Sequence, residues 1–294
     1  MIKLTHIINP VKVGESSDLY VAQPVTFESM KRAKKFAEQE VVVNLITTQF
    51  AEDHEIIPNY FTKTPDLERS ILDIGTFTKQ RKLPLIKDIL ERAVTYDDTA
   101  DYIIYTNVDI ALMPNFYLFV KAQIEQSEHD AFIINRRTIA NHYNVETLQD
   151  AYSDFGKSHP GYDCFIFKKD VFQSFVLNNT YIGANWIGRA MYANLMVFSN
   201  SLKIIKDKHL TFHIGEDGAW LVNDYSEFDA FNKKQVYGVL NALLLVTNNT
   251  SKTRELKNVL MFMDDWGSQA KKKTPNLFLK LKKRVKKIIK AFYQ

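Results

Sequence analysis

The sequence predicts an α/β fold in which a mostly parallel, twisted sheet is flanked by helices, and three observations lead to this prediction. Through the first half of the chain, β-branched apolar runs alternate with segments of helical periodicity. One such run, residues 102–105, stops abruptly at a polar cluster that includes Asn107 and Asp109. The 294 residues are 46% hydrophobic and 24% charged, which is enough to bury a sizeable core. Alternating strands and helices are typical of a parallel sheet wrapped by helices.

The first half of the chain contains the clearest elements. Strands are expected at residues 2–10, 41–47, 102–106 and 131–134, and helices at residues 27–40 and 119–126. A further helix is expected behind Pro84, a residue that the first turn of a helix tolerates. Its apolar stripe consists of Leu85, Ile86, Ile89, Leu90 and Ala93.

The second half is less regular. Strands are expected at 164–167 and 210–214, helices at 183–197 and 232–247, and a linker at 267–275. The predicted organisation is therefore one domain over residues 1–266, a linker over 267–275, and a C-terminal helix over 276–294.

A carboxylate at the end of a buried strand is the most informative feature of the chain. In open α/β sheets, ligands bind outside the carboxyl ends of the strands. Hard cations such as Mg²⁺ or Mn²⁺ prefer carboxylate and amide oxygens, and they typically bridge to substrate phosphates. Asp109 is therefore a candidate for a metal-diphosphate site, and the alternative is that it caps a turn or a helix.

Several classes of protein lack their sequence signatures here. No apolar run reaches the roughly 18 residues of a membrane-spanning helix, and residues 2–10 resemble a strand rather than a secretory signal. One cysteine, Cys164, excludes an internal disulfide framework and is too little for a thiolate zinc site. A reducing cytoplasm is the expected compartment. No GxGxxG, Walker-type loop or hydrolase elbow occurs.

The charge of +4 is unevenly distributed. Residues 271–294 carry ten Lys and Arg and no acid, which leaves 28 basic residues against 34 acidic ones in the rest of the chain. The body is therefore mildly acidic and the C-terminal segment strongly basic. An acidic body argues against nucleic acid as a partner.

The C-terminal segment has the pattern of an amphipathic helix. On a helical wheel its apolar residues fall in one arc and its basic residues opposite, with Leu279 out of place. The apolar set is Leu277, Phe278, Leu281, Val285, Ile288, Ile289 and Phe292. Such a helix lies in the plane of an anionic membrane. The alternative is that it packs on its own domain or on a partner.

Three segments, taken in order, carry a resemblance to a known family. They are residues 82–91 leading into 102–109, then residues 159–167, and finally residues 211–217. With them, roughly residues 1–220 resemble bacterial GT-A-fold glycosyltransferases, the nucleotide-diphospho-sugar transferases of surface polysaccharide synthesis. The resemblance implies a GT-A-like fold.

In that family a DXD motif ends a central strand and holds a divalent cation against the sugar-nucleotide diphosphate. The matching triplet here is Asn107-Val108-Asp109, so an amide replaces the first acid. The resemblance implies Mg²⁺ or Mn²⁺ held by Asp109, Asn107 and His213, although the amide of Asn107 brings no charge to the cation. Phosphate neutralisation by Arg81 and Lys82 is the alternative. For His213, the alternative is a core histidine bonded to backbone.

The resemblance also implies groups that face the sugars. Asp163 follows a glycine just before an apolar strand, where a carboxylate can reach a ligand closely. It is a candidate base for the acceptor hydroxyl or a hydrogen-bond acceptor for a sugar, and His159 is a second candidate base. Arg136 ends a strand and can clamp phosphate, or can belong to a solvated basic turn. Asn9, Pro10 and Thr47 end the first two strands, where the family surrounds the nucleoside.

The sequence thus predicts a glycosyltransferase that moves a sugar from a nucleoside-diphosphate donor to a glycan, with a lipid-linked surface glycan as the expected acceptor. It is expected in the cytoplasm, peripheral on the inner face of the cell membrane, with the basic C-terminal helix as its contact. The alternatives are a sugar-phosphate nucleotidyltransferase, whose Gly-rich basic first loop is not evident, and a non-catalytic scaffold of the same fold, which only Asn107 supports.

Overall fold

The computed structural model describes residues 1–206, 208–215 and 226–265, which form two compact units divided between Leu243 and Leu244. The predicted linker (267–275) and amphipathic helix (276–294) lie outside the described residues, as do Glu216 and Asp217 at the end of the segment 211–217 that carries part of the family resemblance. In the second unit, residues 250–265 are helical and bury Leu256, Val259 and Met263. No described helix is long and apolar enough to span a bilayer.

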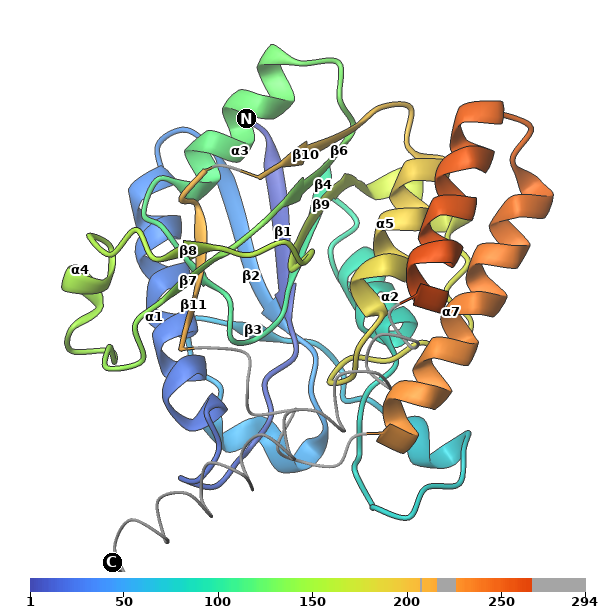
Figure 1. Ribbon diagram of the computed structural model, residues 1–294. Helices are drawn as coiled ribbons and strands as arrows, with labels where there is room; N and C mark the ends of the chain where they lie inside the picture. Colours follow the sequence, from blue (N-terminus) through green and yellow to red (C-terminus); the bar gives the residue numbers. More distant parts are fainter. Residues whose placement is uncertain (207, 216–225, 266–294) are drawn as a thin grey trace, which may run out of the picture. The chain divides into compact units, whose positions relative to one another are not determined.

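The first unit is built on a seven-stranded sheet and a four-stranded sheet (Figure 1). The larger sheet has the order β10 (Leu202–Ile205), β6 (Ala131–Ile134), β9 (Cys164–Lys168), β4 (Tyr102–Thr106), β1 (Lys3–Ile8), β2 (Val42–Thr47) and β3 (Thr62–Lys63). Only β9 runs antiparallel to its neighbours β4 and β6, so the sheet is mostly parallel, as predicted. The smaller sheet has the order β5 (Ala111–Leu112), β11 (Thr211–Ile214), β7 (Arg137–Ile139) and β8 (Lys157–Ser158).

Helices cover both faces of the larger sheet (Figure 1). The labelled helices are α1 (Leu19–Ala37), α2 (Ile86–Tyr96), α3 (Phe116–Gln126), α4 (Leu148–Ala151), α5 (Ile187–Phe198) and α7 (Ser226–Val246), with 3-10 turns η1 (Ala51–Ile56), η2 (Ile71–Asp73) and η3 (Lys169–Ser174). Of these, α4 packs on the smaller sheet. Helices α1 and α3 bury Phe27, Met30 and Phe116 against Leu4 and Ile104 of the sheet. Helices α2 and α5 lie on the other face.

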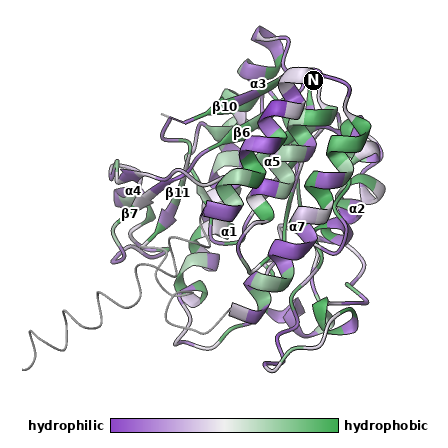
Figure 2. Ribbon diagram, turned by 45° about the vertical axis from the view of Figure 1, so that its right-hand side comes forward, coloured by the Kyte–Doolittle hydropathy of each residue, from purple (hydrophilic) through white to green (hydrophobic). Residues whose placement is uncertain are grey.

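Burial explains why these residues form these elements. The strands β4, β6 and β9 are almost entirely buried, which suits near-continuous apolar runs in a sheet that helices cover on both faces. Figure 2 shows hydrophobic and hydrophilic residues alternating along α1, α2 and α5, the pattern of helices with one buried face. In α2 the buried residues are Ile86, Ile89, Leu90 and Ala93, as predicted from their spacing.

Some predicted boundaries were wrong. Helix α1 begins at Leu19 and not near Phe27, because its first turns bury polar Gln23 and Thr26 and contain Pro24, which hide the apolar periodicity. Helix α5 begins only at Ile187, because Trp186 has a left-handed backbone (φ 83°) that cannot continue a helix. Helix α7 begins earlier than predicted, at Ser226. The strands β3, β5, β7, β8 and β10 were not predicted, and all are short.

Candidate functional site

The carboxyl ends of β1, β2 and β4 surround a cleft of about 610 Å³ in the first unit. Because parallel strands end at the same edge of a sheet, their terminal residues meet there. Five residues predicted from the sequence line this cleft: Asn9, Arg81, Lys82, Asn107 and Asp109. The sequence therefore predicted five of the residues that line this cleft.

Two sheets bring Asp109 and His213 together. Strand β4 ends at Thr106, and a tight turn closed by a hydrogen bond from Ile110 N to the Asn107 carbonyl (3.1 Å) carries Asp109. Beyond the turn, β5 pairs antiparallel with β11, in the register Phe212 to Ala111. This pairing places His213 Nε2 at 3.3 Å from Asp109 Oδ2.

The protonation of His213 follows from its partners. Its Nδ1 lies 2.9 Å from the carbonyl oxygen of Gly215. A carbonyl can only accept, so Nδ1 carries a hydrogen. In the neutral ring Nε2 is then an acceptor, and it faces a carboxylate oxygen that is also an acceptor. A cation has to lie between them, either a proton on Nε2 or a metal ion.

The environment of Asp109 favours a positive neighbour. Its Oδ1 is buried, and in the described part of the chain it has no hydrogen-bond partner. Burial alone would raise the pKa of this carboxyl, but the hydrogen bond and charge of His213, with the charge of Arg136, outweigh it and hold the pKa below its usual range. The group is therefore a carboxylate at neutral pH.

A divalent cation fits this arrangement. The Asp109 carboxylate, whose Oδ1 lacks a partner among the described residues, and the imidazole nitrogen 3.3 Å from its Oδ2 are both metal donors. The amide oxygen of Asn107 already accepts a hydrogen bond from the Tyr105 hydroxyl (2.9 Å). Among the described residues, no group of three or more His, Cys, Asp or Glu could hold a metal. The described residues thus offer two good donors, and oxygens of a ligand would complete the shell.

Asp163, His159 and Arg136 form a second cluster. The pairing of Ile134 in β6 with Cys164 in β9 brings Arg136 next to Asp163. Arg136 Nε donates to Asp163 Oδ2 (3.1 Å), and the two side chains are 4% and 14% exposed. His159 Nδ1 accepts from Gly161 N (3.2 Å) and lies 3.7 Å from Asp163 Oδ2, which is too far for a hydrogen bond. None of the three is among the described residues that line the cleft. The predicted phosphate clamp, Arg136, instead binds a carboxylate.

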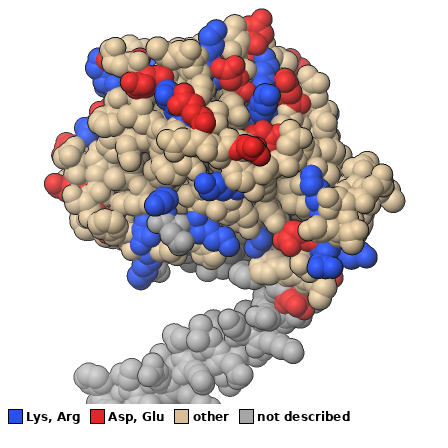
Figure 3. All heavy atoms as spheres, turned by 90° about the horizontal axis from the view of Figure 1, so that it is seen from above, with Lys and Arg blue, Asp and Glu red and all other residues tan. Residues whose placement is uncertain are grey.

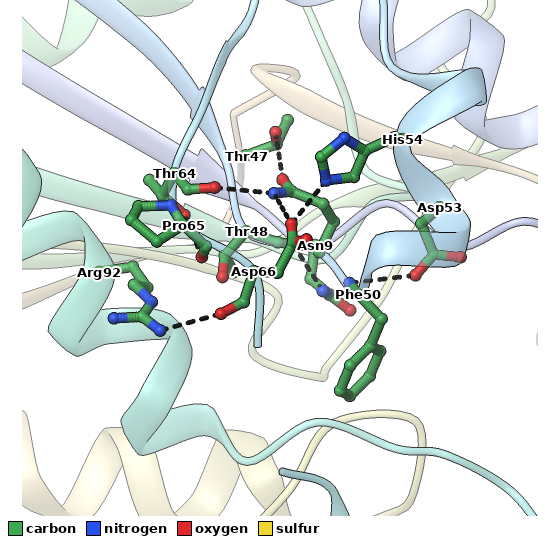
Figure 4. A network of polar contacts seen from close by, with 11 residues as sticks. Asn9, Thr47, Thr48, Phe50, Asp53, His54, Thr64, Pro65, Asp66 and Arg92 are labelled. Carbon is green, nitrogen blue, oxygen red and sulfur yellow. Dashed lines mark hydrogen bonds and ion pairs between the residues drawn. The ribbon is translucent and has the colours of Figure 1, made fainter. Parts of the chain in front are cut away.

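Thr47 and Pro10 are the other two residues that the sequence predicted beside the nucleoside. Both are buried, and neither is among the described residues that line the cleft. The Thr47 hydroxyl donates to Gln49 Oε1 (2.8 Å), and Gln49 Nε2 donates to the Thr64 carbonyl (2.8 Å) and to Asp66 Oδ1 (3.0 Å). Figure 4 shows this network at the ends of β2 and β3. Thr47 therefore ties two strand ends together beside the cleft.

The sequence did not indicate Lys12, Phe50, Glu52 or Asp53, which also line the cleft. Asp53 is 3% exposed and accepts from the backbone amides of Lys12 (2.7 Å) and Phe50 (3.3 Å). Burial raises its pKa, although these amides oppose the shift. The only available signal was their position after a predicted strand, which says nothing about which side chains turn inward.

Comparisons with known proteins show the fold. No protein-family model matches the chain, and no curated protein matches its sequence. Among solved structures, the chain is similar to S. aureus TarS 1-349 in complex with UDP-GlcNAc, with a TM-score of 0.51 and 13% identity over 88% of this chain and 70% of that one. The UDP complex of the same protein gives a TM-score of 0.50 and 12% identity over the same shares. The predicted GT-A-like fold is thereby confirmed.

Proposed function

We propose that this chain is a glycosyltransferase that moves a sugar from a nucleoside-diphosphate donor to a glycan acceptor. The observation that carries the proposal is the Asp109–His213 pair, of which Asp109 lines the strand-end cleft. The fold is similar to that of TarS, a protein whose structure contains UDP-GlcNAc. One oxygen of the Asp109 carboxylate has no partner among the described residues and the other lies 3.3 Å from an imidazole nitrogen, so the pair can supply ligands to a cation that binds a diphosphate.

In this proposal Asp109 and His213 hold a divalent cation, and Asn107 hydrogen-bonds the donor or contributes a weak ligand. The bound cation would stabilise the charge that develops on the departing diphosphate. Asn9 and the neighbouring strand ends would surround the nucleoside, and the apolar wall formed by Phe50, Leu83 and Ile182 would exclude water.

Asp163 has two roles open to it in the same reaction. It would deprotonate the acceptor hydroxyl, or it would accept a hydrogen bond from a sugar without taking the proton. Its ion pair with Arg136 keeps the carboxylate oriented and supports the second role. His159, whose Nδ1 accepts from Gly161, presents Nε2–H as a donor in its neutral form, so it too suits sugar binding.

The cellular setting belongs to the same proposal. A lipid-linked surface glycan in a bacterium is the acceptor that we infer, with the protein peripheral on the inner face of the cell membrane. The amphipathic pattern of residues 276–294 supports a membrane contact. On the face seen in Figure 3, Lys and Arg side chains lie among Asp and Glu side chains in the upper part and gather with few acids in the lower part. The mildly acidic body of the chain argues against nucleic acid as a partner.

Calorimetry with a panel of UDP, GDP, CDP and dTDP in the presence of Mn²⁺ tests the proposal. We expect the wild type to bind at least one of them, and Asp109→Asn to weaken this binding about 10-fold or more and turnover about 100-fold or more. The matched control is Asp98→Asn, because Asp98 is exposed and lies away from the cleft. No binding to any member of the panel, or full binding by Asp109→Asn, would contradict the proposal.

A further inference from the structure

Three cationic side chains line the cleft together with Asn107 and Asp109: Lys12, Arg81 and Lys82. Lys82 Nζ lies 2.7 Å from Glu52 Oε1 and 4.1 Å from the centre of the Phe50 ring, and Lys82 and Glu52 are about half exposed. An ion pair this exposed exchanges partners at little cost, because water screens it. Lys82 can therefore turn to a more highly charged anion in the cleft.

The segment that carries Arg81 and Lys82 is anchored on α7 at its N-terminal side. Glu227, in the first turn of α7, accepts the backbone amides of Thr78 (2.8 Å) and Lys79 (3.0 Å) through its two carboxylate oxygens. Next to it, the ring of Phe77 stacks on that of Phe228, with centroids 4.7 Å apart and planes 7° apart. A carboxylate that accepts two backbone amides is a strong, charge-assisted anchor.

The same segment is fixed at its C-terminal side. The Leu83 carbonyl accepts from Ile71 N (2.9 Å), and the Pro84 carbonyl accepts from Ile182 N (3.1 Å). Leu83, Pro84 and Ile182 themselves line the cleft. Arg81 and Lys82 are therefore held between two anchored flanks, and a ligand does not have to order this backbone.

The metal site alone does not neutralise the negative charge of a bound diphosphate. Asn107 stands where a second acid would be, so Asp109 is the one carboxylate of the triplet and the amide oxygen of Asn107 is engaged by Tyr105. A cation held by one carboxylate and one imidazole is held weakly. The diphosphate group is multiply anionic at neutral pH and needs further positive partners.

We propose that Arg81 and Lys82 form a diphosphate-binding site that works without a metal, and that Glu227 is the residue that positions it. This inference rests on the proposed function. Glu227 touches no ligand in this scheme and acts through the backbone of Thr78 and Lys79. The negative charge of the departing diphosphate would then be neutralised partly by a weakly bound metal ion and partly by Arg81 and Lys82.

Calorimetry in EDTA tests whether Arg81 and Lys82 bind a diphosphate without a metal. The ligand is the nucleoside diphosphate that the wild type binds best in Mn²⁺. We expect binding within about 10-fold of the Mn²⁺ value, and a clear weakening as NaCl rises from 50 to 300 mM. The double variant Arg81→Met/Lys82→Met should weaken binding in EDTA about 30-fold or more. Inorganic pyrophosphate, which carries the charge without a nucleoside, should compete in the wild type. Binding that requires Mn²⁺, or that the double variant retains in EDTA, would overturn the inference.

The variant Glu227→Gln tests whether Glu227 positions the segment that carries Arg81 and Lys82. The glutamine amide has one acceptor oxygen, and its NH2 group would face the second backbone N–H as donor against donor. We therefore expect nucleotide binding in EDTA to fall about 5- to 10-fold and kcat at saturating donor to stay within about 2-fold. Glu91→Gln is the matched control, because Glu91 is a half-exposed acid on α2. Thermal melts separate misfolding from mispositioning. If Glu227→Gln melts like the wild type and binds with wild-type affinity, the positioning role is excluded.

These outcomes separate the inference from the proposed function. A wild type that binds nucleotide with Mn²⁺ but not in EDTA keeps the glycosyltransferase proposal and refutes the metal-independent site. A wild type that binds no nucleotide under either condition refutes both.

Discussion

The guanidinium of Arg136 has an uncommon position for a charged group. It is almost fully buried, donates to Asp163 and to the Thr138 hydroxyl (3.1 Å each), and lowers the pKa of Asp109 through its charge. A buried charge is tolerated only when it is paired and hydrogen-bonded. Sequence patterns indicated a strand-end arginine, but not that its partner would be a carboxylate of the protein.

Neutralising Asp163 should therefore destabilise the fold. We expect Asp163→Asn to lower the free energy of unfolding by about 1–3 kcal/mol, because the charge-assisted hydrogen bond between Asp163 and the buried Arg136 is weakened. Urea denaturation measures the change. The double variant Arg136→Met/Asp163→Leu removes both charges and should be more stable than the single variant. If Asp163→Asn lowers the free energy of unfolding by less than about 1 kcal/mol, the Arg136–Asp163 pair contributes little to stability.

At the level of elements, β4 is held to its neighbours by a buried polar contact directly before the site. The fully buried His6 of β1 contacts the Tyr117 hydroxyl of α3 through Nδ1 and the Thr106 hydroxyl of β4 through Nε2, each at 2.9 Å. Thr106 is followed at once by Asn107. Burial lowers the pKa of His6 to about 3, so this ring is neutral in the native protein.

Stability should therefore fall as the solution is acidified. The unfolded chain binds a proton at His6 below pH 6.5, whereas the native chain does not until the pH approaches the lowered pKa of about 3. The His6 contribution is constant above pH 6.5 and is lost below it, at about 1.4 kcal/mol per pH unit. Between pH 7 and pH 5 we expect the wild type to lose about 2 kcal/mol more than His6→Gln in urea denaturation. Equal losses in both proteins would contradict this assignment.

Some strands could be predicted from the sequence and others could not. The buried strands β4, β6 and β9 were predicted because runs such as residues 131–134 are apolar throughout. The strands β5, β7 and β8 are two or three residues long, too short for any periodicity to mark them. The pairing of β5 with β11 nevertheless brings His213 to Asp109, so an unpredictable element completes the site.

On the scale of the whole molecule, we propose that the first unit binds the nucleotide and that the basic C-terminal segment contacts the membrane. We expect the full chain to bind vesicles that contain anionic phosphatidylserine, and a chain that ends at Pro275 to lose this binding, because ten Lys and Arg lie in residues 271–294 and seven of them follow Pro275. Vesicle co-sedimentation measures the difference.

Controls for this prediction use salt and lipid charge. Binding should weaken at 500 mM NaCl and with uncharged phosphatidylcholine vesicles, because the attraction is electrostatic. Nucleotide affinity should be the same in both chains, since the cleft residues belong to the first unit. If the shortened chain binds anionic vesicles as well as the full chain does, the membrane contact lies elsewhere.

By itself, the sequence determined the mostly parallel α/β fold, the strand that carries Asn107 and Asp109, and five residues of the cleft. These follow from local patterns, because apolar periodicity and strand ends are properties of neighbouring residues. Only the tertiary structure decided that Arg136 pairs with Asp163, that Thr47 binds Gln49, and that Glu227 anchors the segment of Arg81 and Lys82. Glu227 and that segment are about 150 residues apart, and such contacts depend on strand pairing and helix packing, which no local pattern encodes.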